Sequence, residues 1–205
     1  MPHSAIFEKD LVLRSRDILV RPLTADDVAG LAGAAEGLKA LHPFSFVPEG
    51  GAEACTYIET ALHDKSKCDR FPFAIVFHGL IVGTTSYLDF IWWERSGVDR
   101  NLPAAVEIGA TWLARSAQRT RCNTEAKYLL LSHAFETWRV ERVSFRTDER
   151  NVRSRTAIER LGARFEGVRR AERLGADGAI RSSAYYSIVA SEWPEARVLL
   201  ALRLK

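Results

Sequence analysis

Two neighbouring stretches in the middle of the chain carry residue types that could do chemistry. Glu107 opens the apolar stretch EIGATWL, and the polar stretch QRTRCNTEA follows at residues 118–126. A carboxylate placed in a cleft can take a proton from a substrate, so Glu107 is a candidate general base. A polar loop that opens a helix offers unpaired backbone N–H groups and the positive end of the helix dipole, which together bind phosphate. Arg119 and Arg121 would add full charges to that site.

Both stretches also have a plain structural explanation. Glu107 could be an ordinary charged strand residue or an ion-pair partner, and the polar loop could be a well-capped turn between a strand and a helix. The loop lacks the glycines and the lysine of a nucleotide P-loop, and the chain holds no Gly-x-Gly-x-x-Gly dinucleotide fingerprint.

Alternating and helical patterns predict the elements that position these residues. The pattern of the second half is β-α-β-α-β-β: strand 105–113, polar loop 115–123, helix 124–138, strand 142–147, helix 152–161, and a hairpin of strands 165–174 and 180–189 around Gly175–Gly178. The first half reads as strand 18–23, a helix ending near Leu41, helix 53–62, a hairpin of strands 71–77 and 80–88, and a long connection over 90–103. A short surface helix is expected after Pro194.

Length and composition indicate a mixed α/β protein with one domain. The chain has 205 residues, of which 47% are hydrophobic and 27% charged, values typical of a globular protein. We expect a single domain over residues 1–205, with a core at about 11–190 and a short C-terminal helical tail. No stretch approaches the roughly 20 apolar residues of a membrane helix, so no membrane partner is expected.

Positive charge is concentrated in one segment. The chain has 29 basic and 26 acidic residues, but residues 115–173 hold 15 Lys or Arg against 8 Asp or Glu. This excess favours an anionic partner, although a solvated Arg-rich face would give the same count. Binding to RNA or the ribosome depends on this segment alone, and no recognisable reader motif accompanies it. We therefore expect no nucleic-acid partner.

Three cysteines, Cys55, Cys68 and Cys122, form neither an even disulfide set nor a close metal-binding pair. We expect no disulfide framework and no metal site, and a cytoplasmic location. Cys122 lies in the polar loop, but no histidine is near it in the sequence, so packing is a better explanation for it than a nucleophilic role.

The sequence resembles the GNAT acyltransferases, and most closely their ribosomal-protein N-terminal acetyltransferase branch. The resemblance covers about residues 11–190 and is carried by five motifs in family order: ILVRPLTADD at the start, EIGATWLA, QRTRCNTEA, NVRSRTAIERLGA and the closing AYYSIV. It implies a GNAT-type mixed, mainly antiparallel sheet with flanking helices and a splayed parallel strand pair at its centre. It also implies an enzyme, an acetyl-CoA-dependent N-acetyltransferase that acts on a primary amine.

The resemblance also implies where the cofactor binds. Acetyl-CoA would lie between the strands that end near Leu113 and Thr147, with its pantetheine amides paired to backbone at Trp112 and Leu113. The pyrophosphate would bind to the loop, and the pantetheine arm to the start of the next helix. The implied cofactor-binding residues are Trp112, Leu113, Gln118, Arg119, Thr120, Arg121, Cys122, Asn123, Thr124, Asn151 and Ser154.

The chain departs from the family pattern at two places. The family loop usually reads Gln/Arg-x-x-Gly-x-Gly/Ala, and here Arg121 and Asn123 stand at the two small positions. We therefore expect a changed loop geometry, with Arg121 able to offer charge to the phosphates. Many relatives have a tyrosine as general acid where this chain has Ile158, which leaves Ser154 as a weak substitute.

The implied catalytic residues are thus Glu107 and Ser154, and a backbone N–H near Trp112 would stabilise the oxyanion. Phe44, Phe46, Tyr87, Trp92 and Trp93 lie in regions that wall the acceptor pocket in the family, although core packing would also explain them.

Two further questions stay open from the sequence. The acceptor amine could be a protein N-terminus or a small molecule such as an amino acid, a polyamine or an antibiotic, and a homodimer could form. A catalytically weak acyl-CoA-binding or regulatory module of the same fold is the alternative function, because the usual tyrosine is missing.

Overall fold

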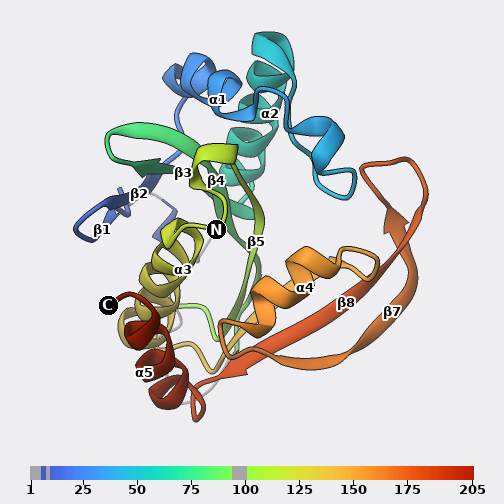
Figure 1. Cartoon of the computed structure of the whole chain (residues 1–205). Helices are drawn as coiled ribbons and strands as arrows, with labels where there is room; N and C mark the ends of the chain where they lie inside the picture. The colour runs from blue at the N-terminus through green and yellow to red at the C-terminus, as the bar shows by residue number, and fades with distance from the viewer. Residues whose placement is uncertain (1–5, 8–9, 94–100) are drawn as a thin grey trace.

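A single eight-stranded sheet in the order β1-β2-β3-β4-β5-β6-β8-β7 organises the protein (Figure 1). The computed structural model describes residues 6–7, 10–93 and 101–205. Among the described strands, β5 and β6 form a parallel pair at the centre, and the other neighbouring pairs are antiparallel. This is the predicted mixed, mainly antiparallel sheet with a central parallel pair.

The strands are β1 (Leu13–Arg14), β2 (Ile18–Pro22), β3 (Arg70–Phe77), β4 (Leu80–Ile91), β5 (Ala105–Leu113), β6 (Arg142–Asp148), β7 (Arg164–Leu174) and β8 (Ile180–Val189). The α-helices are α1 (Val28–Ala35), α2 (Gly50–Ser66), α3 (Cys122–Ser132), α4 (Val152–Glu159) and α5 (Trp193–Arg203). Short 3₁₀ turns lie at Ala25–Asp27, Lys39–Leu41 and Arg115–Ala117, and a π-helical turn at His133–Thr137 continues α3.

Helices α2 and α3 cover opposite faces of the sheet, as two neighbouring threonines of β4 show. The Thr84 hydroxyl lies 2.9 Å from the Tyr57 hydroxyl of α2, whereas the Thr85 hydroxyl accepts a 2.9 Å hydrogen bond from Nζ of Lys127 in α3. Consecutive strand residues point to opposite faces, so α2 and α3 must lie on different sides. Figure 1 shows α1 beside α2, and α5 beside α3.

The largest buried side chains lie on the α3 face of the sheet. The rings of Phe71 and Phe73 stack at 4.8 Å, and Phe73 meets Tyr87 edge to face at 5.7 Å. The Tyr87 hydroxyl donates a 2.6 Å hydrogen bond to the carbonyl of Leu130 in α3. Burying aromatic rings is strongly stabilising, and the hydrogen bond removes the cost of burying the hydroxyl. Tyr87 is therefore a core residue, and it is not among the residues that line the large cavity described below.

Several predicted element bounds need correction. The first helix ends at Ala35, because Glu36 leaves the helical conformation with ψ 125° and Gly37 then adopts φ +64°. Helix α2 runs over seventeen residues, longer at both ends than predicted. The predicted long connection begins later, since β4 continues to Ile91, and its residues 94–100 lie outside the described residues.

The sequence predicts a short surface helix after Pro194. The observed C-terminal helix α5 instead packs on α3. Trp193, Ala196 and Leu200 are buried, and the ring of Trp193 stacks on Phe135 at 5.2 Å. Its indole N–H donates a 3.0 Å hydrogen bond to Glu136. None of the described helices has the length and apolar character needed to cross a membrane.

Candidate active site

The central parallel strands separate after three paired residues. Ala105–Glu107 pair with Arg142–Ser144, and β5 then runs on to Leu113 with no β6 partner. A cavity of about 1590 Å³ opens beside this part of β5. It is lined by the connection between α1 and α2, by β5, by the loop that precedes α3, by α4, and by the tip of the β7–β8 hairpin. The predicted splayed strand pair is thus present and opens onto a large cleft.

A β-bulge shapes the strand at this opening. Thr84 pairs with Trp112 and Ser86 with Gly109, so β5 contains one extra residue relative to β4 between these two pairs. Ala110 takes the left-handed conformation, with φ +48°. A bulge bends a strand and redirects its side chains. The bulge turns the backbone of β5 at the position where the two strands part.

Glu107 is the last β5 residue paired with β6, and its side chain is almost completely buried. Its exposed fraction is 4%, and it is not among the residues that line the cavity. Burial raises the pKa of Glu107 to about 7, against the opposing effect of Arg146, whose Nε lies 3.4 Å from the carboxylate. A carboxyl with a pKa near 7 exchanges protons readily at neutral pH.

Gly109 separates this carboxylate from the cavity. A Cβ atom at Gly109 would lie 2.8 Å from Oε1 of Glu107 and 2.9 Å from Cδ1 of Leu88, so a larger residue would push the carboxylate aside. Gly109 itself lines the cavity. The lack of a side chain therefore brings the Glu107 carboxylate within one residue of the cleft.

The loop 118–124 meets the start of α3 at the other end of the opening. Thr120 orders it, since its hydroxyl donates to the carbonyl of Ala117 at 2.7 Å and accepts from the N–H of Cys122 at 3.1 Å. Among the described residues, the backbone N–H groups of Asn123 and Thr124 have no intramolecular acceptor. Unpaired N–H groups at a helix N-terminus attract anions, and Arg119, Thr120, Asn123 and Thr124 all line the cavity.

Two loop residues point away from the cavity. Arg121 pairs with Asp17 and lies 3.6 Å from Glu125, and neither it nor Cys122 is among the cavity-lining residues. Burial raises the pKa of Cys122 to about 12, which suits a packing role. Arg121 has ordinary helical dihedrals (φ −70°), and the left-handed residue is Arg119 (φ +59°). The loop thus tolerates arginine where the family has glycine.

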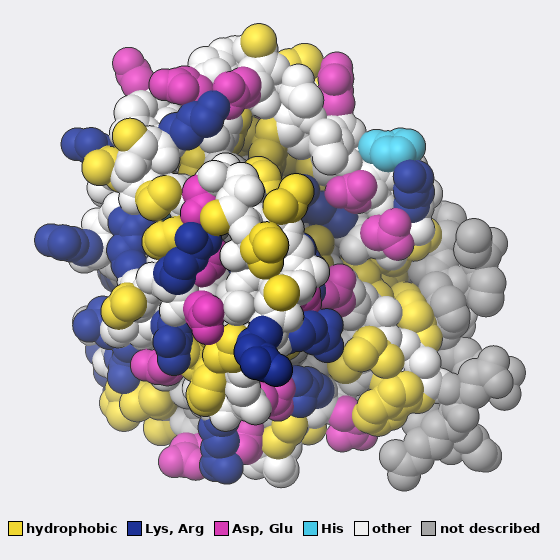
Figure 2. Space-filling model, turned by 90° about the vertical axis from the view of Figure 1, so that its right-hand side faces the viewer, with side chains coloured by type: hydrophobic (Ala, Val, Ile, Leu, Met, Phe, Trp, Pro, Cys, Tyr) yellow, Lys and Arg dark blue, Asp and Glu magenta, His cyan; other side chains and the backbone are white. Residues whose placement is uncertain are grey.

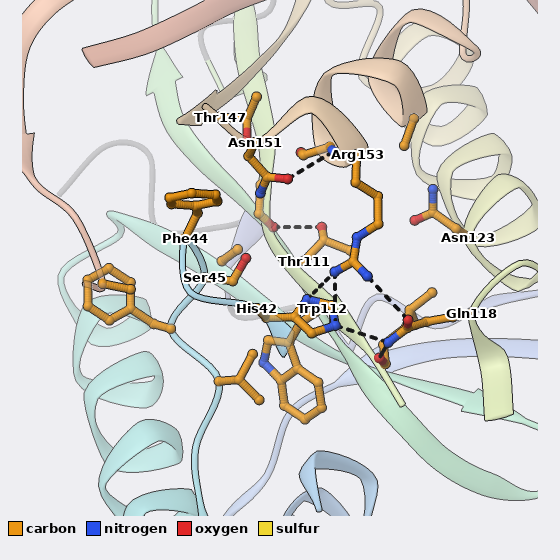
Figure 3. A pocket seen from close by; sticks show the side chains of 18 of the residues that line it. His42, Phe44, Ser45, Thr111, Trp112, Gln118, Asn123, Thr147, Asn151 and Arg153 are labelled. Carbon is orange, nitrogen blue, oxygen red and sulfur yellow. Dashed lines mark hydrogen bonds between the residues drawn. The ribbon is translucent and has the colours of Figure 1, made fainter. Parts of the chain in front are cut away.

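Gln118 holds the loop against the end of β5 and takes part in a cluster that crosses the cavity (Figure 3). Its amide donates a 2.7 Å hydrogen bond to the Leu113 carbonyl, and His42 lies 3.1 Å away. From α4, Arg153 reaches His42 at 2.9 Å and Gln118 at 3.4 Å. Burial and Arg153 lower the pKa of His42 to about 4, so the imidazole is neutral. Arg153 and His42 had no distinctive signal in the sequence.

Asn151 and Ser154 occupy the first turn of α4. The Asn151 side-chain oxygen caps the helix by accepting the N–H of Ser154 at 3.1 Å, and none of the described residues accepts a hydrogen bond from its amide protons. Both residues line the cavity, as do Trp112, Leu113 and Ile158. Trp112 is 4% exposed and packs edge to face on Tyr57 at 6.4 Å.

Arg150 joins three segments at the outer end of the cleft. It pairs with Asp148 at 2.7 Å and with Asp177 of the β7–β8 hairpin at 2.9 Å, and it lies over the ring of Phe44 at 4.6 Å. Phe44 and Phe46 line the cavity, whereas Trp92 and Trp93 do not. The α1–α2 connection and the hairpin tip thereby enclose the outer part of the cleft.

Lys127 is a buried cation that nothing in the sequence singles out, because it occupies a helix position where lysine is common. Its ammonium donates to the hydroxyls of Thr85 and Thr111 at 2.9 and 2.6 Å. Burial lowers the pKa of Lys127 to about 7. Thr111 in turn donates to the Gly109 carbonyl at 3.2 Å, so Lys127 supports the bulge of β5 from the α3 side.

The basic segment is spread over an exposed surface. Figure 2 views the molecule from the side of the β7–β8 hairpin and shows Lys and Arg side chains interspersed with Asp and Glu. Arg164, Arg169, Arg170 and Arg173 of β7 are exposed, and Arg164 and Arg169 pair with Glu192 and Glu172. Much of the charge excess therefore lies outside the cleft.

Comparison with known proteins defines the class to which this fold and cleft belong. The pattern of the acetyltransferase (GNAT) domain matches residues 17–164, so the chain belongs to the GNAT acetyltransferase family. It is an enzyme family that uses acetyl-CoA, and this chain is accordingly an acetyl-CoA-dependent acetyltransferase.

The individual relatives share between 21% and 34% of their residues with this chain. The chain is 27% identical over 179 residues to YdaF of Bacillus subtilis (strain 168), whose name describes a ribosomal N-acetyltransferase, covering 85% of this chain and 91% of YdaF. A protein of T. thermophilus assigned as an acetyltransferase is 34% identical, with a TM-score of 0.78 over 95% of this chain and 97% of that one. Mycobacterium smegmatis RimJ, solved with CoA-disulfide, shares the fold at 21% identity and a TM-score of 0.73, covering 95% and 93% of the two chains.

Proposed function

We propose that this enzyme transfers the acetyl group of acetyl-CoA to a primary amine, either on a small molecule or at a protein N-terminus. One observation carries the proposal: β5 and β6 part after Glu107 and Ser144 and open onto a cleft large enough for cofactor and acceptor together. The names of YdaF and of a Vibrio cholerae ribosomal-protein-serine acetyltransferase keep a ribosomal protein among the candidate acceptors. The free cysteines are consistent with a cytoplasmic enzyme.

The free edge of β5 suits the pantetheine arm of the cofactor. Because β6 has diverged, backbone groups near Trp112 and Leu113 can pair with the pantetheine amides as an added strand would. The free amide protons of Asn151 can donate to the same arm, with the Ser154 hydroxyl one turn further along α4.

The start of α3 suits the pyrophosphate. We assign the unpaired N–H groups of Asn123 and Thr124 and the charge of Arg119 to the phosphate oxygens. Gln118 and Thr120 hold the loop in shape, and Arg121 and Cys122 contribute through the backbone at the helix start. These assignments retain the full set of residues that the sequence resemblance implies.

Conversion of an ammonium acceptor into an amide removes two protons from its nitrogen, and one proton must reach the CoA sulfur. Glu107 accepts the ammonium proton, directly or through a water molecule, and the free amine attacks the thioester carbonyl. A C–N bond forms and the C–S bond breaks. The new amide nitrogen loses its second proton to solvent, and CoA leaves as a thiolate that takes up one proton from solvent or from Ser154. A backbone N–H at the bulge near Trp112 stabilises the oxyanion of the tetrahedral intermediate.

Release of free CoA thiol from acetyl-CoA tests this proposal against a panel of a polyamine, an amino acid, an amine-bearing antibiotic and short peptides. Amine-dependent thiol release with a matching amide product supports it. Binding of CoA, seen as a rise in melting temperature, without thiol release for any amine would instead indicate an acyl-CoA-binding module.

A further inference from the structure

Arg70, the first residue of β3, is a buried cation on the wall of the cleft. It is 8% exposed and lines the cavity. Its Nε donates to the Ser86 hydroxyl at 2.8 Å, its Nη2 donates to the Tyr57 hydroxyl at 2.9 Å, and the guanidinium lies 5.3 Å from the Tyr57 ring centre. Within the described part of the chain, no carboxylate lies within 4.0 Å of it. A buried charge without a counter-charge is costly.

The guanidinium keeps donors for a further partner. Of its five N–H groups, the hydrogen bonds to Ser86 and Tyr57 use one on Nε and one on Nη2. Both protons on Nη1 and one on Nη2 have no acceptor among the residues that the structure describes, and they lie on adjacent nitrogen atoms. This fork matches the two oxygens of a carboxylate.

The strand register places Arg70 close to the proposed reaction centre. Arg70 pairs with Leu88, and Leu88 pairs with Glu107, so Arg70 and Glu107 point to the same face with one strand between them. Two strand spacings amount to about 10 Å between backbones. Arg70 leans toward Ser86, which pairs with Gly109, so its side chain shortens that gap.

The lining of the cleft gives an amine alone little to bind. Among the described residues that line it, the acidic ones are Glu53 and Asp177, and each is already paired, with Lys39 at 2.8 Å and with Arg150 at 2.9 Å. Across the cleft, half-buried Arg181 bonds the Ser183 hydroxyl at 3.0 Å and adds more positive charge. Such a wall favours an acceptor that also carries negative charge.

We propose that the acceptor is an amine that bears a carboxylate group, and that Arg70 binds this carboxylate while the amine lies over Gly109 toward Glu107. This inference rests on the proposed acetyl transfer. The product is then the N-acetylated amino-carboxylate together with CoA, with the bonds formed and broken as above.

Paired acceptors test the inference: amino acids against the matching amino-amides, with phosphoethanolamine as a phosphate-bearing amine, all assayed by thiol release. The wild-type kcat/KM is expected to be about 10- to 100-fold higher for the carboxylate member of a pair, the range for a hydrogen bond to a charged group. Arg70→Gln should remove this preference by lowering kcat/KM for the amino acid while kcat/KM for the amino-amide stays unchanged. Arg70→Lys should keep part of the preference. The matched control is Arg164→Gln, at the first residue of β7, whose side chain is 73% exposed; it should leave the preference unchanged.

Each other outcome has a definite meaning. Equal wild-type rates for acid and amide, or a preference for phosphoethanolamine, would overturn the carboxylate assignment. Equal losses for both acceptors in Arg70→Gln would make Arg70 a structural residue. If that variant does not fold, Tyr57→Phe, which removes one of the hydroxyls that hold the guanidinium, should reduce the preference. Absence of thiol release with every amine would instead refute the acetyl transfer itself, and calorimetric titration of the amino acid into the CoA complex would still test carboxylate binding.

Discussion

Nε of Arg146 lies 3.4 Å from Oε2 of Glu107, at the point where their strands stop pairing. Burial raises the pKa of Glu107 to about 7, and Arg146 opposes that rise and keeps it from going higher. Asp89 pairs with the same guanidinium at 3.1 Å. The carboxyl of Glu107 is therefore half ionised near neutral pH, where it can both accept and release a proton.

Replacing Glu107 by glutamine keeps the size and polarity of the side chain and removes its basicity. Turnover of Glu107→Gln at pH 7 should fall by about 100-fold or more, with CoA affinity nearly unchanged. In the wild-type enzyme, turnover should rise through pH 7 as the carboxyl loses its proton. The variant should not show this rise in its pH–rate profile. The deficit should shrink at high pH, where more of the acceptor is already a free amine.

A pH–rate series on both proteins, with CoA binding by calorimetry, checks this expectation. Unchanged turnover in the variant at pH 7 would exclude the role of base. Joint loss of folding and CoA binding would make Glu107 a structural partner of Arg146.

Charge reversal in the loop should separate phosphate binding from folding. Arg119→Glu is expected to weaken CoA binding by about 10-fold or more, since it removes a charge from the phosphate site, with little change in melting temperature. Arg121→Glu should lower the melting temperature because it breaks the pairs with Asp17 and Glu125, and it should weaken CoA binding because those pairs hold the start of α3 in place. The control is Arg197→Glu, because Arg197 lies in α5 and forms an exposed pair with Glu136. If Arg119→Glu and Arg121→Glu bind CoA as tightly as the control Arg197→Glu, the loop is not the phosphate site.

Asn151 should have two separable roles, capping α4 and donating to the cofactor. Asn151→Ser retains a good N-cap residue, so its melting temperature should stay close to that of the wild type, while CoA binding weakens about 2- to 10-fold through loss of the amide donor. Asn151→Ala should lose CoA affinity and also about 1 kcal/mol of stability. If the serine variant binds CoA as tightly as the wild type, Asn151 is only a cap.

Lys127 should make the stability of the protein depend on pH. Its pKa in the folded state is lowered from 10.5 to about 7, so the folded chain binds this proton more weakly than the unfolded chain. The cost of the buried charge is fully present below pH 7 and disappears as the pH rises toward 10.5. Lys127→Met should therefore melt higher than the wild type at pH 6, by at least about 2–4 °C, the shift for 1 kcal/mol in a chain of this size.

Thermal unfolding at pH 6, 8 and 10 measures this difference, which should narrow as the pH rises. Lys67→Met, at the exposed end of α2, is the matched control and should show no such trend. A constant difference across this range would contradict a buried, charge-destabilised lysine.

The sequence was informative where a local pattern determines the structure. The bounds of β5 and β8 agree with those predicted from alternating apolar residues, and the order of the elements in the second half is confirmed. Helix ends were less predictable, because they depend on local dihedrals such as that of Gly37 and on the π-helical turn that begins at His133.

In the cleft, only some of the residues could be predicted from the sequence. Glu107 and the loop that follows could be singled out because motifs mark them. Arg70, Lys127 and Arg146 look like ordinary charged residues of a strand or a helix, and only the pairing of distant strands and the packing of α3 bury them beside the cleft. Cross-strand register is a non-local property, so no spacing along the chain could reveal these three residues.

A crystal structure of the protein with CoA would show whether the cofactor lies in the opening between β5 and β6, on which the proposed function depends. We expect the pantetheine amides to pair with the backbone of β5 at Trp112 and Leu113. We also expect the pyrophosphate to lie within hydrogen-bonding distance of the N–H groups of Asn123 and Thr124. CoA bound elsewhere on the molecule, with the opening between the strands empty, would refute this placement of the cofactor.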